Sequence, residues 1–486
     1  MPTDREIMQR IARKAMLERG LQPDFTAQAF AELGKLDRES AVLEKGSRDL
    51  KGLFWASIDN DDSRDLDQLT AVEALDGGEV KIYVAVADVD SLVKKGSAID
   101  EHARRNTTSV YTAGGNFPML PEKLSTDLTS LNYGKDRNAL IIEITAGVDG
   151  SLKNSTVYQG IVNNRAKLAY NSVAAWLDGK EEMPAGIKEV SGLEACLRLQ
   201  DSTAARFKQK RRESGSLDFT TIEANAVFVE EKLSGLKEDE KNRAKEIIEE
   251  FMVAANGVIA RFLSAKNFPS LRRIVRKPKR WEKIVLLAGE KGFRLPALPE
   301  PKALEEFLLK QKASDPVSFP DLSLAVIKLL GAGEYVAELP GDPPIGHFGL
   351  AVRDYTHSTA PNRRYPDLIA IRLLKAAATG RPCPYTKDEL TSLANHCTLQ
   401  EDAAKKVERQ VGKSAAALLL KDMIGEKFSA IVTGASDKGT WVRLFEQPVE
   451  GRLIRGFERL EVGMRLSVRL VSTDVERGFI DLEKVR

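Results

Sequence analysis

The sequence has few cysteines, and that scarcity narrows the class of protein. Three cysteines occur in 486 residues, at Cys196, Cys383 and Cys397. A sparse and odd-numbered set argues against a disulfide framework and favours a reducing compartment. Cys383, His396 and Cys397 also lack the paired spacing of a zinc site. Neither a disulfide-stabilised secreted domain nor a zinc finger is therefore expected.

Long apolar runs are missing as well. No stretch approaches the roughly 18 apolar residues of a membrane span, and the charged first residues, MPTDREIMQR, do not resemble a signal peptide. We therefore expect a soluble cytoplasmic protein without a membrane partner. The 73 basic and 71 acidic residues nearly cancel, to a net charge of +2. Only local clusters of charge can then indicate nucleic-acid binding.

What is present predicts an α+β multidomain protein. Apolar residues at helical spacing predict short helices in residues 1–45, the third of them around residues 38–44. Three such helices fit a helix-turn-helix or winged-helix RNA-binding unit, and equally a cap packed on the main domain. Residues 46–423 alternate strands and helices. Residues 424–486 contain short strands separated by turns, the pattern of an OB-type β-barrel.

The middle region offers two strands and two helices that can be placed with their bounds. LFWASI (53–58) predicts a buried strand, and VKIYVAVADV (80–89) predicts a second one, joined to it by a Gly77-Gly78 turn within a mixed sheet. Residues 244–263 have helical spacing throughout. Thr386 and Glu389 form a capping-box pattern that opens another helix, which runs to Met423.

The stretch SIDNDDSRDLDQ (57–68) concentrates five aspartates, Asp59, Asp61, Asp62, Asp65 and Asp67. An EF-hand is excluded, because the positions that need Gly and Glu hold Arg64 and Thr70. A structural acidic turn and a metal site are left as alternatives by spacing alone. Because the ligands on offer are oxygens, a metal here would be Mg²⁺ or Mn²⁺. Several carboxylates can hold two ions about 3.5–4 Å apart, which suits phosphodiester hydrolysis.

This stretch resembles the first motif of the RNB catalytic domain of the ribonuclease II / ribonuclease R family. Further motifs occur in the family's order over roughly residues 48 to 420. They are VAVADVDSLVKKGSAID, YTAGGNFPMLPEKLSTDLTSL, KRRESGSLDF, IIEEFMVAAN, HFGLAVRDYTHSTAPNRRYPDLIAIRLL and DAAKKVERQV. The C-terminal strands are similar to the family's S1 domain.

The resemblance implies roles for particular residues. Asp59, Asp65 and Asp67 match acids that bind Mg²⁺ and position the attacking water. Arg363 matches the arginine that binds the scissile phosphate, for which a bidentate guanidinium is suited. The alternative for Arg363 is an ion pair with a buried acid. Arg364 beside it is expected either to bind RNA or only to support structure. Glu408 matches a glutamate near the active site that is expected to fix an arginine, with an ordinary surface glutamate as the alternative.

The resemblance also implies contacts with RNA. Tyr111 and Phe219 match aromatics that stack the last bases, and Glu250 matches an acid that contacts a ribose hydroxyl. In the S1 barrel, Phe428 and Trp441 are the candidate stacking residues. Two basic clusters, RFKQKRR (206–212) and LRRIVRKPKR (271–280), lie where the family runs single-stranded RNA into the enzyme.

Two departures from the family stand out. Bacterial members carry two cold-shock barrels before the catalytic domain, whereas 58 residues precede Asp59 here. We expect the N-terminal helices to replace the barrels and to leave the entrance for RNA more open. Gln68 stands where the family has its fourth acid, and a neutral amide is a weaker ligand for Mg²⁺.

The expected function is a monomeric 3′→5′ exoribonuclease that releases nucleoside 5′-monophosphates from single-stranded RNA. It would use two metal ions. The alternative is an RNA-binding protein of the same fold in which Gln68 has abolished catalysis.

Overall fold

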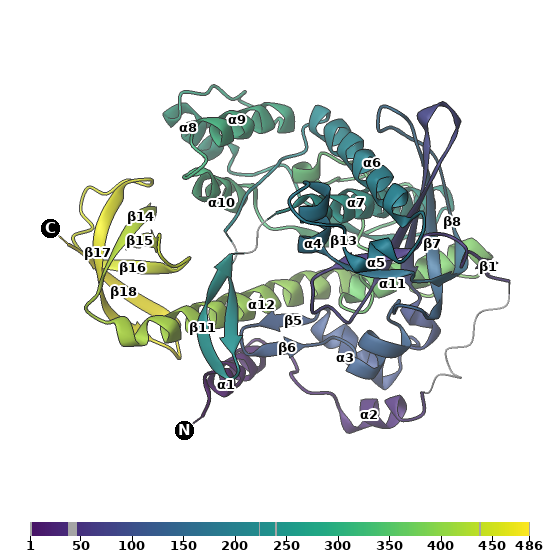
Figure 1. Cartoon of the computed structure of the whole chain (residues 1–486), viewed down its shortest axis with the longest axis horizontal. Coiled ribbons are helices and arrows are strands. Elements are labelled where there is room, and N and C mark those ends of the chain that lie inside the picture. Colours follow the sequence, from purple (N-terminus) through teal and green to yellow (C-terminus); the bar gives the residue numbers. More distant parts are fainter. Residues whose placement is uncertain (1, 37–45, 223, 239–240, 437–438, 486) are drawn as a thin grey trace.

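The computed structural model describes residues 2–36, 46–222, 224–238, 241–436 and 439–485 (Figure 1). The third helix predicted in the N-terminal region, around residues 38–44, lies outside these ranges. Within them, no helix has both the length and the apolar character needed to cross a membrane.

A seven-stranded sheet forms the centre of the molecule, in the order β1-β8-β7-β4-β3-β2-β9. Its outer pairs, β1 with β8 and β2 with β9, are parallel, and the inner pairs are antiparallel, which confirms the predicted mixed sheet. The strands are β1 (Arg48–Asp49), β2 (Ala56–Asp59), β3 (Gln68–Ala74), β4 (Val80–Ala87), β7 (Asp136–Ala146), β8 (Leu152–Asn163) and β9 (Ala166–Ala169).

The glycine turn joins a different pair of strands from the one predicted. Gly77 and Gly78 both have positive φ, 69° and 79°, which glycine adopts without steric cost. They connect β3 to β4, so the prediction that the first strand of the hairpin is LFWASI was wrong. That segment ends in β2, and the aspartate-rich loop runs from β2 to β3. Gln68 therefore does not end the acidic run in a loop but begins a central strand.

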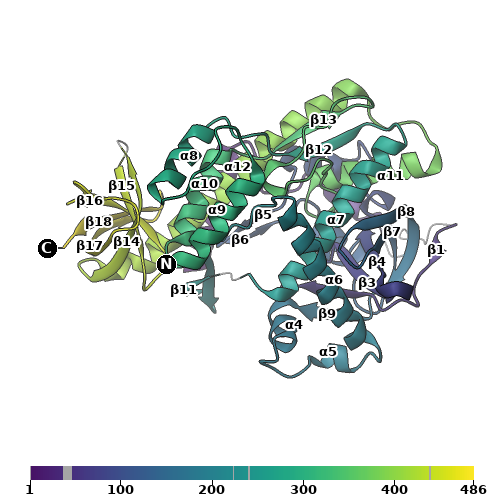
Figure 2. The ribbon, with the colours of Figure 1, turned by 90° about the horizontal axis from the view of Figure 1, so that it is seen from above.

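Helices cover the sheet, and one of them follows the loop that contacts Asp67. α7 (Arg243–Ala265) contacts β2, β4, β7 and β8, and α6 (Leu193–Glu213) lies against α7 and β3 (Figure 2). α7 confirms the helix predicted over residues 244–263. The other helices of this body are α3 (Ala98–Asn106), α4 (Tyr170–Leu177), α5 (Ala185–Lys188) and α11 (Tyr365–Thr379).

One long helix, α12 (Lys387–Leu420), runs along the molecule from the sheet to the C-terminal barrel (Figure 1). Thr386 caps it by accepting the Glu389 N–H at 3.2 Å, as the sequence pattern predicts. Its Val407 and Val411 pack with Met8 and Ile11 of α1 (Asp4–Glu18), and α2 (Ala27–Leu33) lies against α3. The two described N-terminal helices thus lie against the main body, on separate elements.

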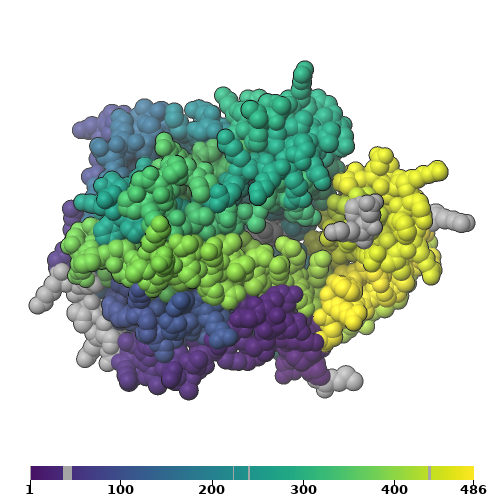
Figure 3. All heavy atoms as spheres, turned by 180° about the vertical axis from the view of Figure 1, so that it is seen from behind, coloured from purple at the N-terminus to yellow at the C-terminus, as the bar shows by residue number. Residues whose placement is uncertain are grey.

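The C-terminal strands close into the predicted five-stranded barrel, in the order β14-β15-β16-β18-β17. Ala416, Ala417 and Leu420 of α12 pack into its core, and Arg10 of α1 pairs with Glu476 on its rim. Figure 3 shows the barrel beside both the N-terminal helix and α12. The strands are β14 (Lys427–Ser436), β15 (Gly439–Leu444), β16 (Glu450–Arg455), β17 (Arg465–Asp474) and β18 (Phe479–Lys484).

A small helical unit with its own apolar core contacts α6 on the side away from the seven-stranded sheet (Figures 1 and 2). Trp281, Phe307 and Phe319 are buried in that core. Its helices are α8 (Trp281–Glu290), α9 (Pro301–Ser314) and α10 (Phe319–Leu330). Among the described residues, three two-stranded antiparallel sheets complete the fold. They pair β5 (Val110–Thr112) with β6 (Gly115–Phe117), β10 (Ala224–Val229) with β11 (Lys232–Glu238), and β12 (Ser270–Ile274) with β13 (Glu334–Glu338).

Candidate active site

The acidic loop is anchored at both of its ends. Asp59, the last residue of β2, accepts hydrogen bonds from the Asn60 N–H at 2.8 Å and from the Ser63 hydroxyl at 3.0 Å. Asp61 and Asp62 are exposed on the turn that follows. The chain then returns inward, and Asp67 is 1% exposed immediately before β3. The loop therefore presents three of its five aspartates toward the protein and two toward solvent.

Asp67 is held by the loop that precedes α11. Its Oδ1 accepts the Asn362 N–H at 2.8 Å, and its Oδ2 lies 3.1 Å from Nε of Arg363. Burial raises the pKa of Asp67 to about 7, although the Arg363 charge and the Asn362 hydrogen bond oppose that rise. The charge on this carboxylate therefore depends on a cation beside it.

Arg363 is the cation that faces these acids. Burial alone would lower the pKa of its guanidinium, but Asp67, together with Tyr111, Asp59 and Asp65, outweighs burial and raises that pKa. The group therefore stays charged, and 38% of its side chain is exposed. Both properties suit the predicted role of binding a phosphate.

Tyr111 on β5 lies beside the same group. Its hydroxyl is 3.4 Å from Oδ2 of Asp65, and its backbone N–H donates to Oε1 of Glu408 at 3.0 Å. Tyr111 is 42% exposed, so its ring is accessible for stacking. The structure thus joins Asp65, Tyr111 and Glu408, and it shows Glu408 fixing the backbone of the predicted stacking residue.

Comparison with known protein families decides what this arrangement is part of. Residues 47–380 match the RNB domain, and residues 426–485 match the RNase II-type exonuclease C-terminal S1 domain. The chain belongs to the RNB family. The resemblance drawn from the motifs is thereby confirmed.

Curated relatives of this RNB chain are longer than it is. Ribonuclease R of Aquifex aeolicus is 30% identical over 469 residues, which cover 91% of this chain and 65% of the relative. Ribonuclease R of Escherichia coli is 31% identical over 427 residues, covering 84% of this chain and 51% of that protein. This RNB chain thus spans between half and two thirds of the length of these relatives.

Solved structures share the fold of this RNB chain. RNase R of Mycoplasma genitalium, in complex with double-stranded RNA, superposes with a TM-score of 0.86 at 25% identity, over 98% of this chain and 82% of that chain. Yeast Ssd1, described as a pseudonuclease, has a TM-score of 0.71 at 19% identity, over 93% of this chain and 55% of its own. The second likeness shows a common fold alone.

The carboxylates of this RNB chain offer oxygen ligands that are not fully paired. Oδ2 of Asp67 and Oε1 of Gln68 are buried, and neither accepts a hydrogen bond from the described residues. A buried oxygen without a hydrogen bond is costly, and a divalent cation would satisfy Oε1 of Gln68 and would compete with Arg363 for Oδ2 of Asp67. The donor set therefore fits Mg²⁺ or Mn²⁺. Across the described ranges, however, no three acidic, His or Cys side chains are already gathered as a ready-made metal site.

One residue near the acids was missed by the sequence analysis. Tyr170 begins α4 directly after Ala169, which pairs with Asp59 across the parallel β2–β9 register. Burial and the negative charge of Asp59 raise the pKa of Tyr170, so its hydroxyl keeps its proton. The signal that would have found it is the pairing of β2 with β9, which no local pattern reveals.

Two predicted RNA contacts are buried in this structure. Glu250 is 3% exposed and forms a two-point ion pair with Arg211, at 2.7 Å to Nε and 2.5 Å to Nη2, so its oxygens already have a partner within the protein. Phe428 is 6% exposed and packs in the barrel core, where its ring cannot stack on a base. Both patterns were those of buried residues.

The remaining predicted contacts lie in different places. Arg364 pairs with Asp367 at 2.7 Å at the start of α11. This contact fits the second of its two predicted roles, which is to support the structure. Trp441 is half-buried on β15, and Phe219 is half-buried against the helical unit. Neither side chain has a hydrogen bond or ring contact, among those that the structure shows, with Asp65, Asp67, Tyr111 or Arg363.

The basic clusters are largely paired inside the protein. In residues 206–212, Lys208 pairs with Glu246, Arg211 with Glu250, and Arg212 with Asp218. In residues 271–280, Arg272 pairs with Glu338, Arg273 with Glu401 and Arg276 with Glu334. These six residues therefore each have an acidic partner within the protein, and the role of the clusters in guiding RNA stays a prediction.

Proposed function

We propose that this RNB chain is a 3′→5′ exoribonuclease that hydrolyses single-stranded RNA to nucleoside 5′-monophosphates with two Mg²⁺ or Mn²⁺ ions. The observation that carries the proposal is the meeting of Asp67, Arg363, Asp65 and Tyr111 within an RNB fold. Acidic oxygens, a cation suited to phosphate and an exposed aromatic ring lie together there, which supports the proposal.

Each residue has a task that its surroundings support. Asp59, Asp65 and Asp67 would hold the ions, with the buried oxygen of Gln68 as a weaker ligand. The ions would activate water and stabilise the leaving oxygen. Arg363, released in part from Asp67, would bind the non-bridging phosphate oxygens. The ring of Tyr111 would stack on a base near the 3′ end, a contact that tolerates any sequence.

A second function is favoured by one observation. Gln68 removes a carboxylate from the site, and Arg363 occupies Oδ2 of Asp67, an oxygen that a metal would need. A chain locked in this state would bind RNA without cleaving it. The exposed ring of Tyr111 and the charged Arg363 would serve either function.

The deciding experiment is incubation of 5′-labelled single-stranded RNA with the protein and Mg²⁺. A ladder that shortens from the 3′ end, with release of nucleoside 5′-monophosphates, supports the exoribonuclease. RNA that stays intact while binding tightly, at any concentration of Mg²⁺ or Mn²⁺, supports the second function. A 3′-phosphorylated product would exclude hydrolysis of the kind proposed.

A further inference from the structure

Three cations from separate segments converge on the carboxylate of Asp218, next to Phe219. Arg212 of α6 lies 2.9 Å from it, Lys241 3.3 Å, and Lys312 of α9 3.2 Å. The two lysines lie outside both basic clusters seen in the sequence. Burial would raise the pKa of Asp218, but the charges of Lys241 and Lys312 outweigh it and lower the pKa to about 2.

Among the described residues, the positive charge around Asp218 is not balanced locally. Glu305 accepts the Asp218 N–H at 2.9 Å, but it is 2% exposed and burial raises its pKa. Even with that glutamate ionised, three cations face two carboxylates within the described ranges. The cations remain accessible, since the side chains of Lys241, Lys312 and Arg212 are 54%, 41% and 35% exposed.

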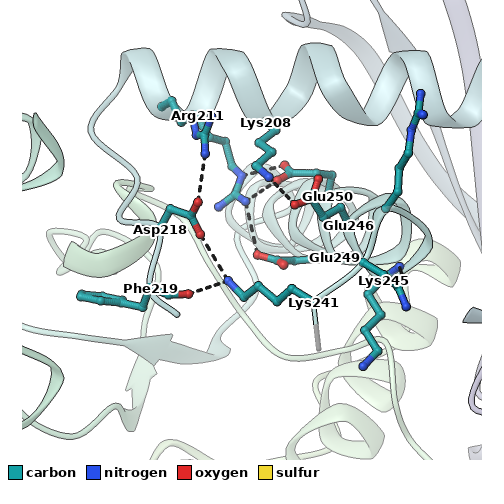
Figure 4. A network of polar contacts seen from close by, with 12 residues as sticks. Lys208, Arg211, Asp218, Phe219, Lys241, Lys245, Glu246, Glu249 and Glu250 are labelled. Carbon is teal, nitrogen blue, oxygen red and sulfur yellow. Dashed lines mark hydrogen bonds and ion pairs between the residues drawn. The ribbon is translucent and has the colours of Figure 1, made fainter. Parts of the chain in front are cut away.

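The neighbouring part of the same network has the opposite balance. There, Glu246, Glu249 and Glu250 of α7 form ion pairs with Lys208 and Arg211 of α6, so three acids meet two cations in direct contact, with Lys245 nearby on α7 (Figure 4). The network is therefore polarised, with its positive end at Asp218 and its negative end on α7. A polyanion passing the network would be drawn to the positive end and repelled from the other.

The positive end is tied to a ring that the resemblance assigns to RNA. Lys241 donates to the backbone oxygen of Phe219 at 2.7 Å, while the ring of Phe219 points away from the network (Figure 4). A base resting on the exposed part of that ring would bring its own backbone phosphates near Lys241. Ammonium and guanidinium groups bind phosphate regardless of base sequence.

We propose that Arg212, Lys241 and Lys312 form a phosphate subsite for the RNA backbone beside Phe219, with Asp218 as an internal competitor that holds the cations together. The proposal rests on RNA being the substrate. Asp218 then lowers the affinity for RNA, because its carboxylate already pairs with the cations that the phosphate would contact.

The test is the salt dependence of RNA binding, measured with a fluorescent single-stranded oligonucleotide in EDTA so that no cleavage occurs. Lys241→Gln and Lys312→Gln should each reduce the slope of log affinity against log salt by about 0.7, the value for one lost phosphate contact on a single strand. Lys310→Gln, an exposed lysine on the same helix as Lys312, should leave the slope unchanged.

A substitution of the competitor has the opposite expected sign. Asp218→Asn should tighten RNA binding and keep the wild-type slope, whereas Asp315→Asn, an equal change of charge at the exposed end of α9, should change affinity little. Thermal unfolding of each variant checks that it is folded. If Asp218→Asn weakens binding in folded protein, the cations are merely structural and the proposal is overturned.

The outcomes separate this subsite from the proposed activity. Cleavage by the wild type together with unchanged slopes in both lysine variants overturns the subsite and leaves the exoribonuclease standing. Reduced slopes without any cleavage support the subsite and overturn the exoribonuclease. A wild type that binds no RNA overturns both.

Discussion

The acidic loop of residues 59–68 and the ion-pair network of α6 and α7 both contain many charged side chains. The two regions differ in how completely those side chains are hydrogen-bonded. In the network, Glu250 and Arg211 meet through two hydrogen bonds, and Lys208 pairs with Glu246. At the end of the loop, Oδ2 of Asp67 and Oε1 of Gln68 accept no hydrogen bond within the described part of the chain, although Oδ2 lies 3.1 Å from Nε of Arg363. Charge that is paired stabilises the fold, whereas charge left partly unpaired is available for a ligand.

The largest effect should come from Asp67→Asn. The amide can still accept the Asn362 N–H, but it removes the negative charge that a metal ion and Arg363 require. Because such a charge contributes several kcal/mol to the transition state, we expect cleavage to fall by at least about a thousandfold while RNA binding is largely kept. Single-turnover cleavage and binding in EDTA measure the two quantities.

The matched control for that loss is Asp61→Asn. Asp61 is exposed on the same loop and matches no acid of the family motif. We expect its cleavage rate to remain within about twofold of the wild type, since surface charges are screened. Equal losses in the two variants would show that the loop acts only through its total charge.

The network should respond in stability instead of catalysis. Glu250→Gln leaves Arg211 with 17% of its side chain exposed and without its buried partner, which destabilises proteins by about 3–5 kcal/mol. Glu249→Gln removes a half-exposed acid 3.5 Å from the same arginine and should cost less than about 1 kcal/mol. Urea unfolding compares them. If both variants lose a similarly small free energy of unfolding, the ion pair of Glu250 with Arg211 is not a buried structural contact, and Glu250 remains a candidate for RNA binding.

A smaller effect should appear in the pH dependence of the network. The pKa of Asp218 is lowered from 3.8 to about 2. Its contribution to stability is then present above pH 4 and is lost as the pH falls through 2, by about 2 kcal/mol in total. The stability difference between the wild type and Asp218→Asn should therefore shrink from pH 5 to pH 2.5. A constant difference would contradict the assigned pKa.

The contrast between loop and network also explains which parts could be predicted from the sequence. The acids and Arg363 were found because they stand in ordered motifs, and α7, α12 and the barrel were found because their patterns are local. The partners of the basic residues could not be found. Arg211 and Glu250 are 39 residues apart, and Arg273 and Glu401 are 128 apart. Only the folded chain shows that such charges neutralise each other.

Gln68 is the position where one substitution would replace a neutral buried oxygen with a charged one beside Asp67. Gln68→Asp adds a carboxylate where an oxygen is already buried without a hydrogen bond. Without metal it should lower the melting temperature, because a further buried charge joins Asp67. With Mg²⁺ it should gain more stability than the wild type, and the Mg²⁺ midpoint should fall several-fold, because carboxylate is the stronger ligand.

Thermal unfolding against Mg²⁺ at constant ionic strength measures this shift without reliance on activity. Gln68→Met, similar in size but without the oxygen, is the matched control. It should unfold no earlier than the wild type in EDTA, because it removes an unpaired polar group, and it should respond less to Mg²⁺. If Gln68→Asp and Gln68→Met respond to Mg²⁺ equally, the side chain at position 68 does not reach the metal. The weaker ligand would then have to be sought among Asp59 and Asp65 alone.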